Sequence, residues 1–448
     1  MQLKRDLSFW DVFSLALGQI IGGGIMVLVG IAIGYTGYAV PIAFVLSAVL
    51  SLIKQMPVAF MGSAMPATGG LYVYCKRILG PQVGFFYLAV LLITHILISL
   101  FALGFAEYAA ALIPSINVSV VAVGILVLFY VVNLFGVKEA AIVQKIMMVL
   151  LLIGLSTLVF FGILEVDYTN FSGQGSLLPN GWYGFGLACV VLSFATGGGQ
   201  YVSELGGEMK NPQRDLPRAI IYSTLTAGVF FALVSIVAVG ILPVEQTSGQ
   251  PLSVVAKAIL PDWVYVAFIV GAGLFALATN LNATFAWATK SVLIACEDGW
   301  LPKRIAVVND RYKTPHILLT MLLFLGAAPI IADKDMRYII MLGGGLVFIY
   351  DFIPLVAAFV FCKKMPDVFE KATMKMSEGN LKIISVLGMC VLVVQAALSF
   401  SDVGQEGSIL VCIYVALVMV YIKLRSKHNV RALADQAEAA AADQAVSG

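Results

Sequence analysis

The chain consists of long apolar blocks separated by short polar loops, and this pattern constrains its fold more than any other feature. About 20 apolar residues, each rising 1.5 Å along a helix, cross the hydrocarbon core of a bilayer. Only 12% of the residues are charged, which is about half the share typical of soluble domains. The pattern therefore predicts an all-α polytopic membrane protein. The twelve expected transmembrane helices are residues 11–36, 39–63, 83–112, 118–135, 140–164, 182–205, 219–241, 262–290, 316–333, 337–362, 381–400 and 408–424.

The distribution of basic residues predicts which loops face the cytoplasm. Lysine and arginine gather in the loops on one side of the predicted spans and in both terminal segments, whereas Lys257, Lys334 and Arg337 fall on the opposite side. Loops rich in these residues remain cytoplasmic. We therefore expect an integral plasma (inner) membrane protein whose N-terminus, residues 1–8, and C-terminal tail, residues 426–448, are both cytoplasmic.

Two of the predicted spans are interrupted by three consecutive glycines, Gly22–Gly24 in span 1 and Gly197–Gly199 in span 6. Three glycines cost a helix about 3 kcal/mol in propensity relative to alanine. Non-helical backbone inside a bilayer is tolerated only where it is buried in protein or lines a cavity. Close helix packing through small residues is the alternative explanation for either run. Two runs in corresponding spans favour a binding site at the bilayer midplane.

The spacing of the glycine runs also divides the chain into repeats. The second broken span follows five spans after the first, and an odd number of crossings reverses the direction of the second set. Residues 9–165 and 182–362 are therefore predicted to form a 5+5 inverted repeat, with broken helices 1 and 6, as in many secondary transporters. Residues 380–425 add two extra C-terminal helices.

The ends of the broken helices suit the two charged groups of an amino acid. A half-helix that begins after Gly22 presents free backbone N–H groups and a positive dipole end, which attract a carboxylate. A half-helix that ends near Phe194 and Ala195 presents carbonyl oxygens and a negative end, which attract an ammonium. The predicted ligand is therefore an amino-acid-like zwitterion.

Five motifs in residues 6–425 resemble, in order, those of the amino acid–polyamine–organocation (APC) permeases, which have the leucine-transporter fold. They are GQIIGGGIM in span 1, MPATGGLYVYCKRILGP after span 2, NLFGVKEAAIVQ at the start of span 5, ELGGEMKNPQRDLPRAI after span 6, and CEDGWLPK followed by KTPH after span 8. The resemblance implies a secondary active transporter that works by alternating access. A receptor or channel that does not carry its ligand across the membrane is the alternative.

The resemblance also implies which residues hold the substrate. Backbone groups of Ile21, Gly22, Gly23 and Gly24 would bind the carboxylate, and carbonyls near Gly18, Ile20, Phe194 and Ala195 the amine. The expected site further includes His95, Ser99, Thr196, Gly197, Gly198 and Thr284. Phe194 matches an aromatic gate of some members, although an ordinary core or lipid-facing phenylalanine is an equal alternative.

The residues that would couple transport to an ion depart from the family pattern. Leu151 stands where many members have a lysine in place of a sodium ion, and Gln200 replaces a glutamate of some antiporters. Ionisable groups within a bilayer are usually functional or paired. The candidates for coupling or gating are therefore His95, Lys54, Glu107, Gln200, Asp351 and Lys290. We expect proton coupling or exchange rather than sodium coupling, for which Thr284 is the one suitably placed hydroxyl.

Several candidates keep alternative roles. His95 could accept a proton or bind substrate, or it could be a hydrogen-bonded structural histidine. Asp351 could carry a proton, bind an amine substrate, or form a structural ion pair with Lys54. Glu107, nearer the outer end of span 3, could attract cationic substrates or simply face solvent.

The sequence also limits the class of function. It contains no P-loop motif, which argues against ATP-driven transport, and its three histidines lie too far apart to form an enzyme site. We expect no cofactor, no metal site and no nucleic acid partner. A small neutral amino acid is the expected substrate, while a cationic amino acid, polyamine or organic amine stays open. The expected partners are this substrate, a coupling proton or exchange substrate, and membrane lipids, and a homo-oligomer stays open.

Overall fold

The computed structural model describes residues 4–171, 177–333, 336–400 and 409–426. Within these ranges the chain is helical, and its only β-type pairings are two isolated bridges, Leu7–Met209 and Thr68–Leu205. The expected all-α class is confirmed. The predicted C-terminal tail, residues 426–448, lies almost entirely outside the described residues.

The first half of the chain contains eight α-helices. They are α1 (Phe9–Ile20), α2 (Gly23–Thr36), α3 (Val40–Ala64), α4 (Gly70–Leu79), α5 (Pro81–Thr94), α6 (Ile98–Leu112), α7 (Val118–Leu134) and α8 (Val137–Gly162). Short 3-10 helices η1 (Gly37–Ala39), η2 (His95–Leu97) and η3 (Tyr168–Phe171) connect or extend them.

The second half begins with α9 (Gly181–Ala195), the 3-10 helices η4 (Gly199–Glu204) and η5 (Gly206–Glu208), and α10 (Pro212–Ile241). It continues with α11 (Val244–Thr247), α12 (Leu252–Ile259), α13 (Asp262–Phe268), the π-helix η6 (Ile269–Leu274), α14 (Phe275–Trp287) and α15 (Lys290–Glu297). The rest comprises the 3-10 helix η7 (Lys303–Ile305), α16 (His316–Ile331), α17 (Met336–Lys364), α18 (Pro366–Glu370), α19 (Glu378–Phe400) and a last helix, Ile409–Ser426.

Many of these helices are long and apolar enough to cross a membrane. Nine segments of the described chain meet that requirement, and three shorter apolar helices accompany them at Val118–Leu134, Gly181–Ser193 and His316–Ile331. Large apolar side chains such as Ile42, Ile153 and Phe160 are exposed by 57–69%, as expected for surfaces that contact lipid. The molecule is a polytopic membrane protein, whereas the count of twelve spans and their grouping into inverted repeats stay predictions.

Both glycine runs break their helices where the sequence predicts. α1 ends at Ile20 and α2 begins at Gly23, so the helix is interrupted at two residues in between. α9 ends at Ala195, and the chain becomes helical again only at Gly199. Gly198 has a φ of +106°, a conformation that a residue with a Cβ rarely adopts. The second break therefore depends on glycine at this position.

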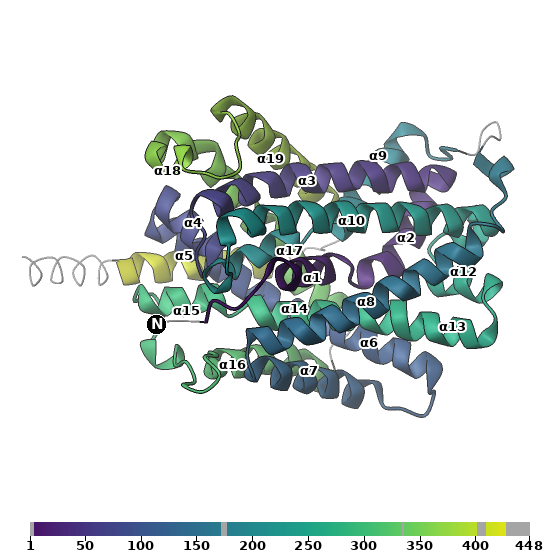
Figure 1. Ribbon diagram of the computed structural model, residues 1–448, viewed down its shortest axis with the longest axis horizontal. Coiled ribbons are helices and arrows are strands. Elements are labelled where there is room, and N and C mark those ends of the chain that lie inside the picture. Colours follow the sequence, from purple (N-terminus) through teal and green to yellow (C-terminus); the bar gives the residue numbers. More distant parts are fainter. Residues whose placement is uncertain (1–3, 172–176, 334–335, 401–408, 427–448) are drawn as a thin grey trace, which may run out of the picture.

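The broken helix formed by α1 and α2 lies in the middle of the bundle (Figure 1). α1 contacts α8, α10 and α14, and α2 contacts α9, the first half of the other broken helix. Gly154 allows α8 to approach the π-helix η6 closely, because a Cβ there would lie 2.7 Å from the Ala272 nitrogen. The two breaks thus lie among the long helices of the bundle.

Candidate functional site

A cavity of about 190 Å³ lies at the two breaks. Its lining comes from α1, α2, α3, α5, η2, α6, α9, η4, α14 and α17, so segments from both predicted repeats contribute. The lining residues that the sequence predicted are Ile20, Gly22, Gly24, His95, Ala195, Gly197, Gly198 and Thr284, together with Lys54, Gln200 and Asp351.

The break in span 1 presents unpaired backbone donors to this cavity. The Ile21 N–H donates to the Leu17 carbonyl at 2.8 Å, and the Gly22 N–H donates to the Ile20 carbonyl at 2.9 Å. The N–H groups that open α2 follow directly, and the first N–H groups of a helix have no partner within it. In the described part of the chain, no charged side chain hydrogen-bonds to this backbone. This helix start can therefore accept an external anion.

Gln19 fixes the geometry of this break. Its side chain accepts a hydrogen bond from the Trp287 indole at 2.8 Å and donates to the Asn280 side chain at 3.1 Å. Asn280 returns a bond from its amide to the Gln19 carbonyl at 3.0 Å, and the Thr284 hydroxyl lies 3.3 Å from the Gln19 side-chain oxygen. The end of α1 is thus held against one face of α14.

The break in span 6 differs because a basic side chain lies at its carbonyl end. The Lys54 ammonium is 3.5 Å from the Ser193 carbonyl, in the last turn of α9, and donates to the Gln395 side-chain oxygen at 2.8 Å. The Ser51 hydroxyl also donates to the Ser193 carbonyl, at 2.7 Å. A cation at a helix C-terminus is favoured by the helix dipole. The protein itself thus supplies a positive charge where a substrate amine was expected.

Asp351 of α17 faces the same cavity without a close partner. Its Oδ1 atom lies 3.5 Å from both the Gln200 amide and the Tyr201 hydroxyl, at the long limit for a hydrogen bond. The Tyr201 hydroxyl makes a short hydrogen bond to the Tyr350 hydroxyl. Lys54 donates to Gln395 and Ser193 instead of pairing directly with Asp351. The direct ion pair that the sequence left open does not form.

His95 lies in the 3-10 turn η2, between α5 and α6, where it lines the cavity. Its ring centroid is 5.5 Å from that of Trp287, and its Nε2 atom is buried without a hydrogen-bond partner among the described residues. Ser99, one turn further, is buried and donates to the Gly326 carbonyl at 2.7 Å. His95 therefore presents a polar atom that a ligand could use, whereas Ser99 joins α6 to α16.

The remaining predicted site residues lie behind the cavity wall or elsewhere. Gly18 packs against the Gln144 side chain, so close that a Cβ would collide with it. Ile21 is buried in the core. The Thr196 hydroxyl is bonded to Ser51 and the Ser47 carbonyl at 2.7 and 3.1 Å. The backbone of Gly23 begins α2. The side chain of Phe194 lies outside the described structure, so its role as a gate stays a prediction.

Two predicted coupling candidates lie away from the cavity. Glu107, in the last turns of α6, is exposed and does not line it. Lys290 forms a buried ion pair with Glu208, with 2.8 Å between Nζ and Oε1. This pair joins α15 to the segment after the span-6 break. Lys290 therefore has a structural partner.

Further polar contacts connect the segments at the end of the molecule where the chain begins. Asp298 accepts hydrogen bonds from the Tyr72 hydroxyl at 2.6 Å and from the Lys76 ammonium at 2.7 Å. Burial, followed by the bond to Asp298, raises the pKa of the Tyr72 hydroxyl far above its usual value. The Leu7 N–H donates to the Glu208 carbonyl at 3.0 Å, so the segment before α1 joins the same group of contacts.

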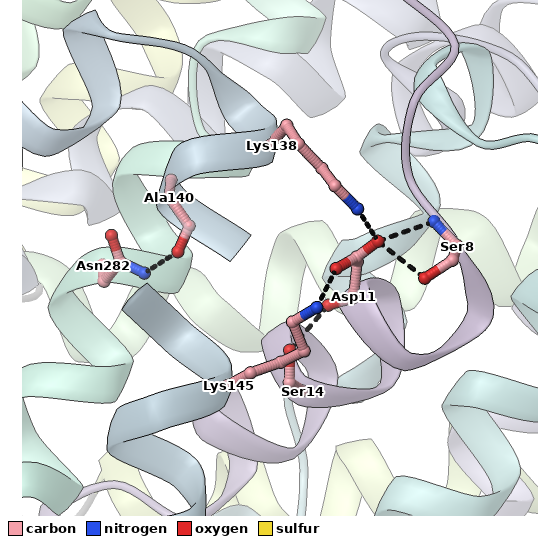
Figure 2. A network of polar contacts seen from close by, with 7 residues as sticks. All are labelled: Ser8, Asp11, Ser14, Lys138, Ala140, Lys145 and Asn282. Carbon is pink, nitrogen blue, oxygen red and sulfur yellow. Dashed lines mark hydrogen bonds and ion pairs between the residues drawn. The ribbon is translucent and has the colours of Figure 1, made fainter. Parts of the chain in front are cut away.

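A buried carboxylate anchors α1 to α8 (Figure 2). Asp11 is fully buried, and its oxygens lie 2.5 Å from the Lys138 ammonium and 2.8 Å from the Lys145 ammonium. The Ser8 N–H and hydroxyl donate to the same carboxylate at 2.8 and 2.6 Å. The first half of the broken helix, α1, is thus held on α8 by charge as well as by packing.

The sequence missed several polar residues of the cavity, namely Gln19, Gln55, Asn280, Tyr201, Trp287 and Tyr350. Gln19 and Tyr201 lie within three residues of the glycine runs Gly22–Gly24 and Gly197–Gly199, and Asn280 lies four residues before Thr284. A polar side chain inside an apolar span was the available signal. Trp287 and Tyr350 carry no such signal, because aromatic residues are common in these spans.

The broken helices and the enclosed cavity define an integral membrane protein of the transporter class. The sequence matches the family model described as amino acid permease over residues 7–428. The chain therefore belongs to the amino acid permease family of the APC superfamily, as the motifs predict.

Characterised relatives from Bacillus subtilis (strain 168) agree with this assignment. The chain is 27% identical to the branched-chain amino acid permease BcaP, over 82% of this chain and 83% of the relative. It is 26% identical to a methylthioribose transporter over 87% of each chain. It is 25% identical to the serine/threonine exchanger SteT, over 71% of this chain and 74% of the relative. These proteins are transporters and not enzymes, so the chain is a transport protein.

Proposed function

We propose that this permease is a secondary active transporter that moves a small neutral amino acid by alternating access, coupled to protons or in exchange. The observation that carries the proposal is the cavity at the two breaks, with unpaired N–H groups at the start of α2. These groups suit the carboxylate shared by all amino acids. The carbonyl at the end of α1 and the unpaired carboxylate of Asp351 are the groups that suit the amine.

The size of the cavity limits the substrate. An engineered cavity of about 150 Å³ in another protein holds benzene. By the same measure, 190 Å³ suits roughly eight non-hydrogen atoms, the size of serine, threonine or valine. The names of the branched-chain permease and the serine/threonine exchanger support substrates of this kind.

A cationic substrate is the second candidate, because Asp351 lines the cavity. Lys54 lines it as well, and its ammonium opposes a second positive charge in the same space. The name of a vacuolar cationic amino acid transporter of Arabidopsis thaliana supports a substrate of this kind, although this chain covers only 56% of that relative. The neutral amino acid therefore remains the first proposal.

We also propose the orientation of the molecule. The basic loops favour an orientation in which the end with the N-terminus, shown on the left in Figure 1, faces the cytoplasm across an inner or plasma membrane. In that orientation the contacts of Asp11 and of Lys290 close the cavity toward the cytoplasm. Opening on that side requires α1 to leave α8, which alternating access would provide.

Transport by the purified full-length chain in liposomes tests the proposal. Liposomes loaded with one unlabelled amino acid are diluted into each labelled amino acid in turn, with and without an inward proton gradient and with sodium replaced by choline. We expect saturable uptake of small neutral amino acids that is accelerated by internal substrate and independent of sodium. Flux that neither saturates nor responds to internal amino acid would show a channel rather than a carrier.

A further inference from the structure

A second buried carboxylate lies near the cavity, outside the residues that contact it. Glu204 is the last residue of η4, and its side chain is fully buried. One carboxylate oxygen accepts a hydrogen bond from the Ser291 hydroxyl at 2.5 Å. The other oxygen, Oε1, is buried and has no hydrogen-bond partner among the described residues. A buried ionised carboxylate is costly unless it is paired, so this group needs an explanation.

Two tyrosine hydroxyls near Glu204 also lack partners. Tyr74 of α4 and Tyr87 of α5 are fully buried, and neither hydroxyl forms a hydrogen bond within the described structure. Tyr74 lies on α4, which contacts both η4, the element that carries Glu204, and α5, the helix of Tyr87. An internal water normally has two to four polar partners. The Glu204 oxygen and the two hydroxyls, from three different elements, are a sufficient set for such a water.

The 3-10 geometry of η4 connects this group to the cavity. Tyr201 and Glu204 are three residues apart, and side chains at this spacing in a 3-10 helix lie on the same face, separated by about 6 Å along the axis. Tyr201 is hydrogen-bonded to the Tyr350 hydroxyl and lies 3.5 Å from the Asp351 carboxylate. The Tyr87 ring packs edge-on against Tyr350, with 6.2 Å between centroids. Tyr201 and Tyr87 thus both contact Tyr350 beside Asp351, and Tyr201 shares η4 with Glu204.

The surroundings of Glu204 contain no basic partner for it. In the described part of the chain no lysine, arginine or histidine forms an ion pair with Glu204, and Lys290 is already paired with Glu208. The donors that act on its charge are the Ser291 hydroxyl and the Leu71 backbone N–H at the start of α4, and both are neutral. The Cys75 thiol is a further titratable group near it, and the charge of Arg77 acts on Tyr74. A bound proton is therefore the most economical way to neutralise Glu204.

We propose that Glu204 is the inner proton-binding group of a relay that begins at Asp351 in the substrate cavity. The inference rests on the proposed proton coupling. One proton leaves the Asp351 carboxyl, each intervening hydroxyl or water gains one proton and gives one up, and one proton reaches the Glu204 carboxylate. Asp351 is then ionised and Glu204 neutral. Release of the proton from Glu204 to the cytoplasm, once this end opens, resets the relay.

The test separates proton movement from amino acid movement. Liposomes that contain the full-length protein enclose a pH-sensitive dye, and a mixture of the twenty amino acids is added outside. Acidification of the interior reports proton entry. Exchange of labelled for unlabelled amino acid across the same membranes, at equal pH on both sides, reports transport without net proton movement.

Glu204→Gln keeps the size of the side chain but cannot bind and release the proton. We expect it to slow amino acid-dependent acidification at least tenfold while retaining exchange within about threefold. Tyr87→Phe should slow acidification less and leave exchange unchanged. Glu139→Gln is the matched control, because Glu139 is an exposed carboxylate at the start of α8. It should match the wild type in both assays.

Each other outcome overturns the relay. If liposomes with the Glu204→Gln protein acidify as fast as those with the wild type, the Glu204 carboxylate does not carry the proton. A monodisperse Glu204→Gln protein that loses exchange together with acidification shows a structural role. Wild-type protein that exchanges amino acids without any acidification refutes the relay while amino acid transport stands, whereas absence of both activities refutes the proposed function itself.

Discussion

Replacing Gly22 with alanine adds a methyl group at the point where span 1 is interrupted. The new Cβ would lie 2.7 Å from the Asn280 side-chain nitrogen and 3.4 Å from its Cγ. Asn280 cannot easily move aside, because its amide is bonded to the Gln19 side chain at 3.1 Å and to the Gln19 carbonyl at 3.0 Å. The backbone at Gly22 has a φ of −101°, which alanine adopts freely, so the effect comes from this contact.

The expected effect can be worked out from these contacts. Losing two hydrogen bonds costs about 1 kcal/mol each, and the least severe overpacking costs about 1 kcal/mol more. If the substrate binds only to the undistorted break, restoring that arrangement takes about 3 kcal/mol from the free energy of binding, which corresponds to roughly a hundredfold loss of apparent affinity. The loss falls on substrate binding because Asn280 and Gln19 fix the position of the N–H groups that open α2.

The assay is the apparent Kd of the amino acid selected by the uptake screen, measured by its protection of purified protein against thermal unfolding. Gly124→Ala is the matched control, since a Cβ at Gly124 of α7 would meet nothing within 4 Å. Gly22→Ala combined with Asn280→Ala should bind about as well as Asn280→Ala alone, because the clash and the bonds share one side chain. Binding by Gly22→Ala within threefold of wild type, or strict additivity in the double variant, would refute the reasoning.

Three further substitutions have defined outcomes. Asp11→Asn should lower the stability by about 2 kcal/mol, a value between those for buried and exposed ion pairs, because Asp11 is buried while its lysine partners are about one-third exposed. An unchanged midpoint of thermal unfolding in detergent would contradict this prediction. Lys54→Met should raise the affinity for lysine relative to serine at least tenfold, measured by competition for uptake, because the ammonium that repels a cationic substrate is removed. An unchanged ratio of the two affinities would show that the charge of Lys54 does not act on the bound substrate. Lys290→Met should lower stability by about 3–5 kcal/mol because it leaves Glu208 buried and unpaired. Adding Glu208→Gln to that variant should restore much of the thermal stability; a double variant no more stable than Lys290→Met would contradict a stabilising ion pair.

The breaks could be predicted from the sequence because they depend on local backbone chemistry. Three consecutive glycines weaken a helix wherever they occur, and a bilayer restricts where such a weakness can be placed. The positions at which α1 ends and η4 begins, Ile20 and Gly199, follow directly from those runs. The same argument placed Gly22, Gly24, Gly197 and Gly198 at the cavity.

The side-chain contacts of the cavity could not be predicted in this way. Gln19 and Trp287 are 268 residues apart, and Lys54 and Gln395 are separated by 341. Each contact depends on how two helices are rotated about their axes, which periodicity does not determine in spans that are apolar on nearly every side. For the same reason the sequence did not distinguish His95, which lines the cavity, from Ser99, which bonds to the Gly326 carbonyl instead.

The two breaks are unlike each other as ligand sites, although the same sequence pattern produces both. At span 6 the carbonyl end of α9 already faces the Lys54 ammonium, and a second cation there would meet a like charge. At span 1 no charged side chain among the described residues is bonded to the N–H end of α2, so an anion would bind there without competition. The carboxylate is therefore the group by which this site would recognise its substrate first. The amine is left to the carbonyl end of α1 and to Asp351, the group from which the proposed proton relay starts. Binding of an ammonium beside Asp351 favours its ionised form, and this would send the proton toward Glu204 only when substrate is present.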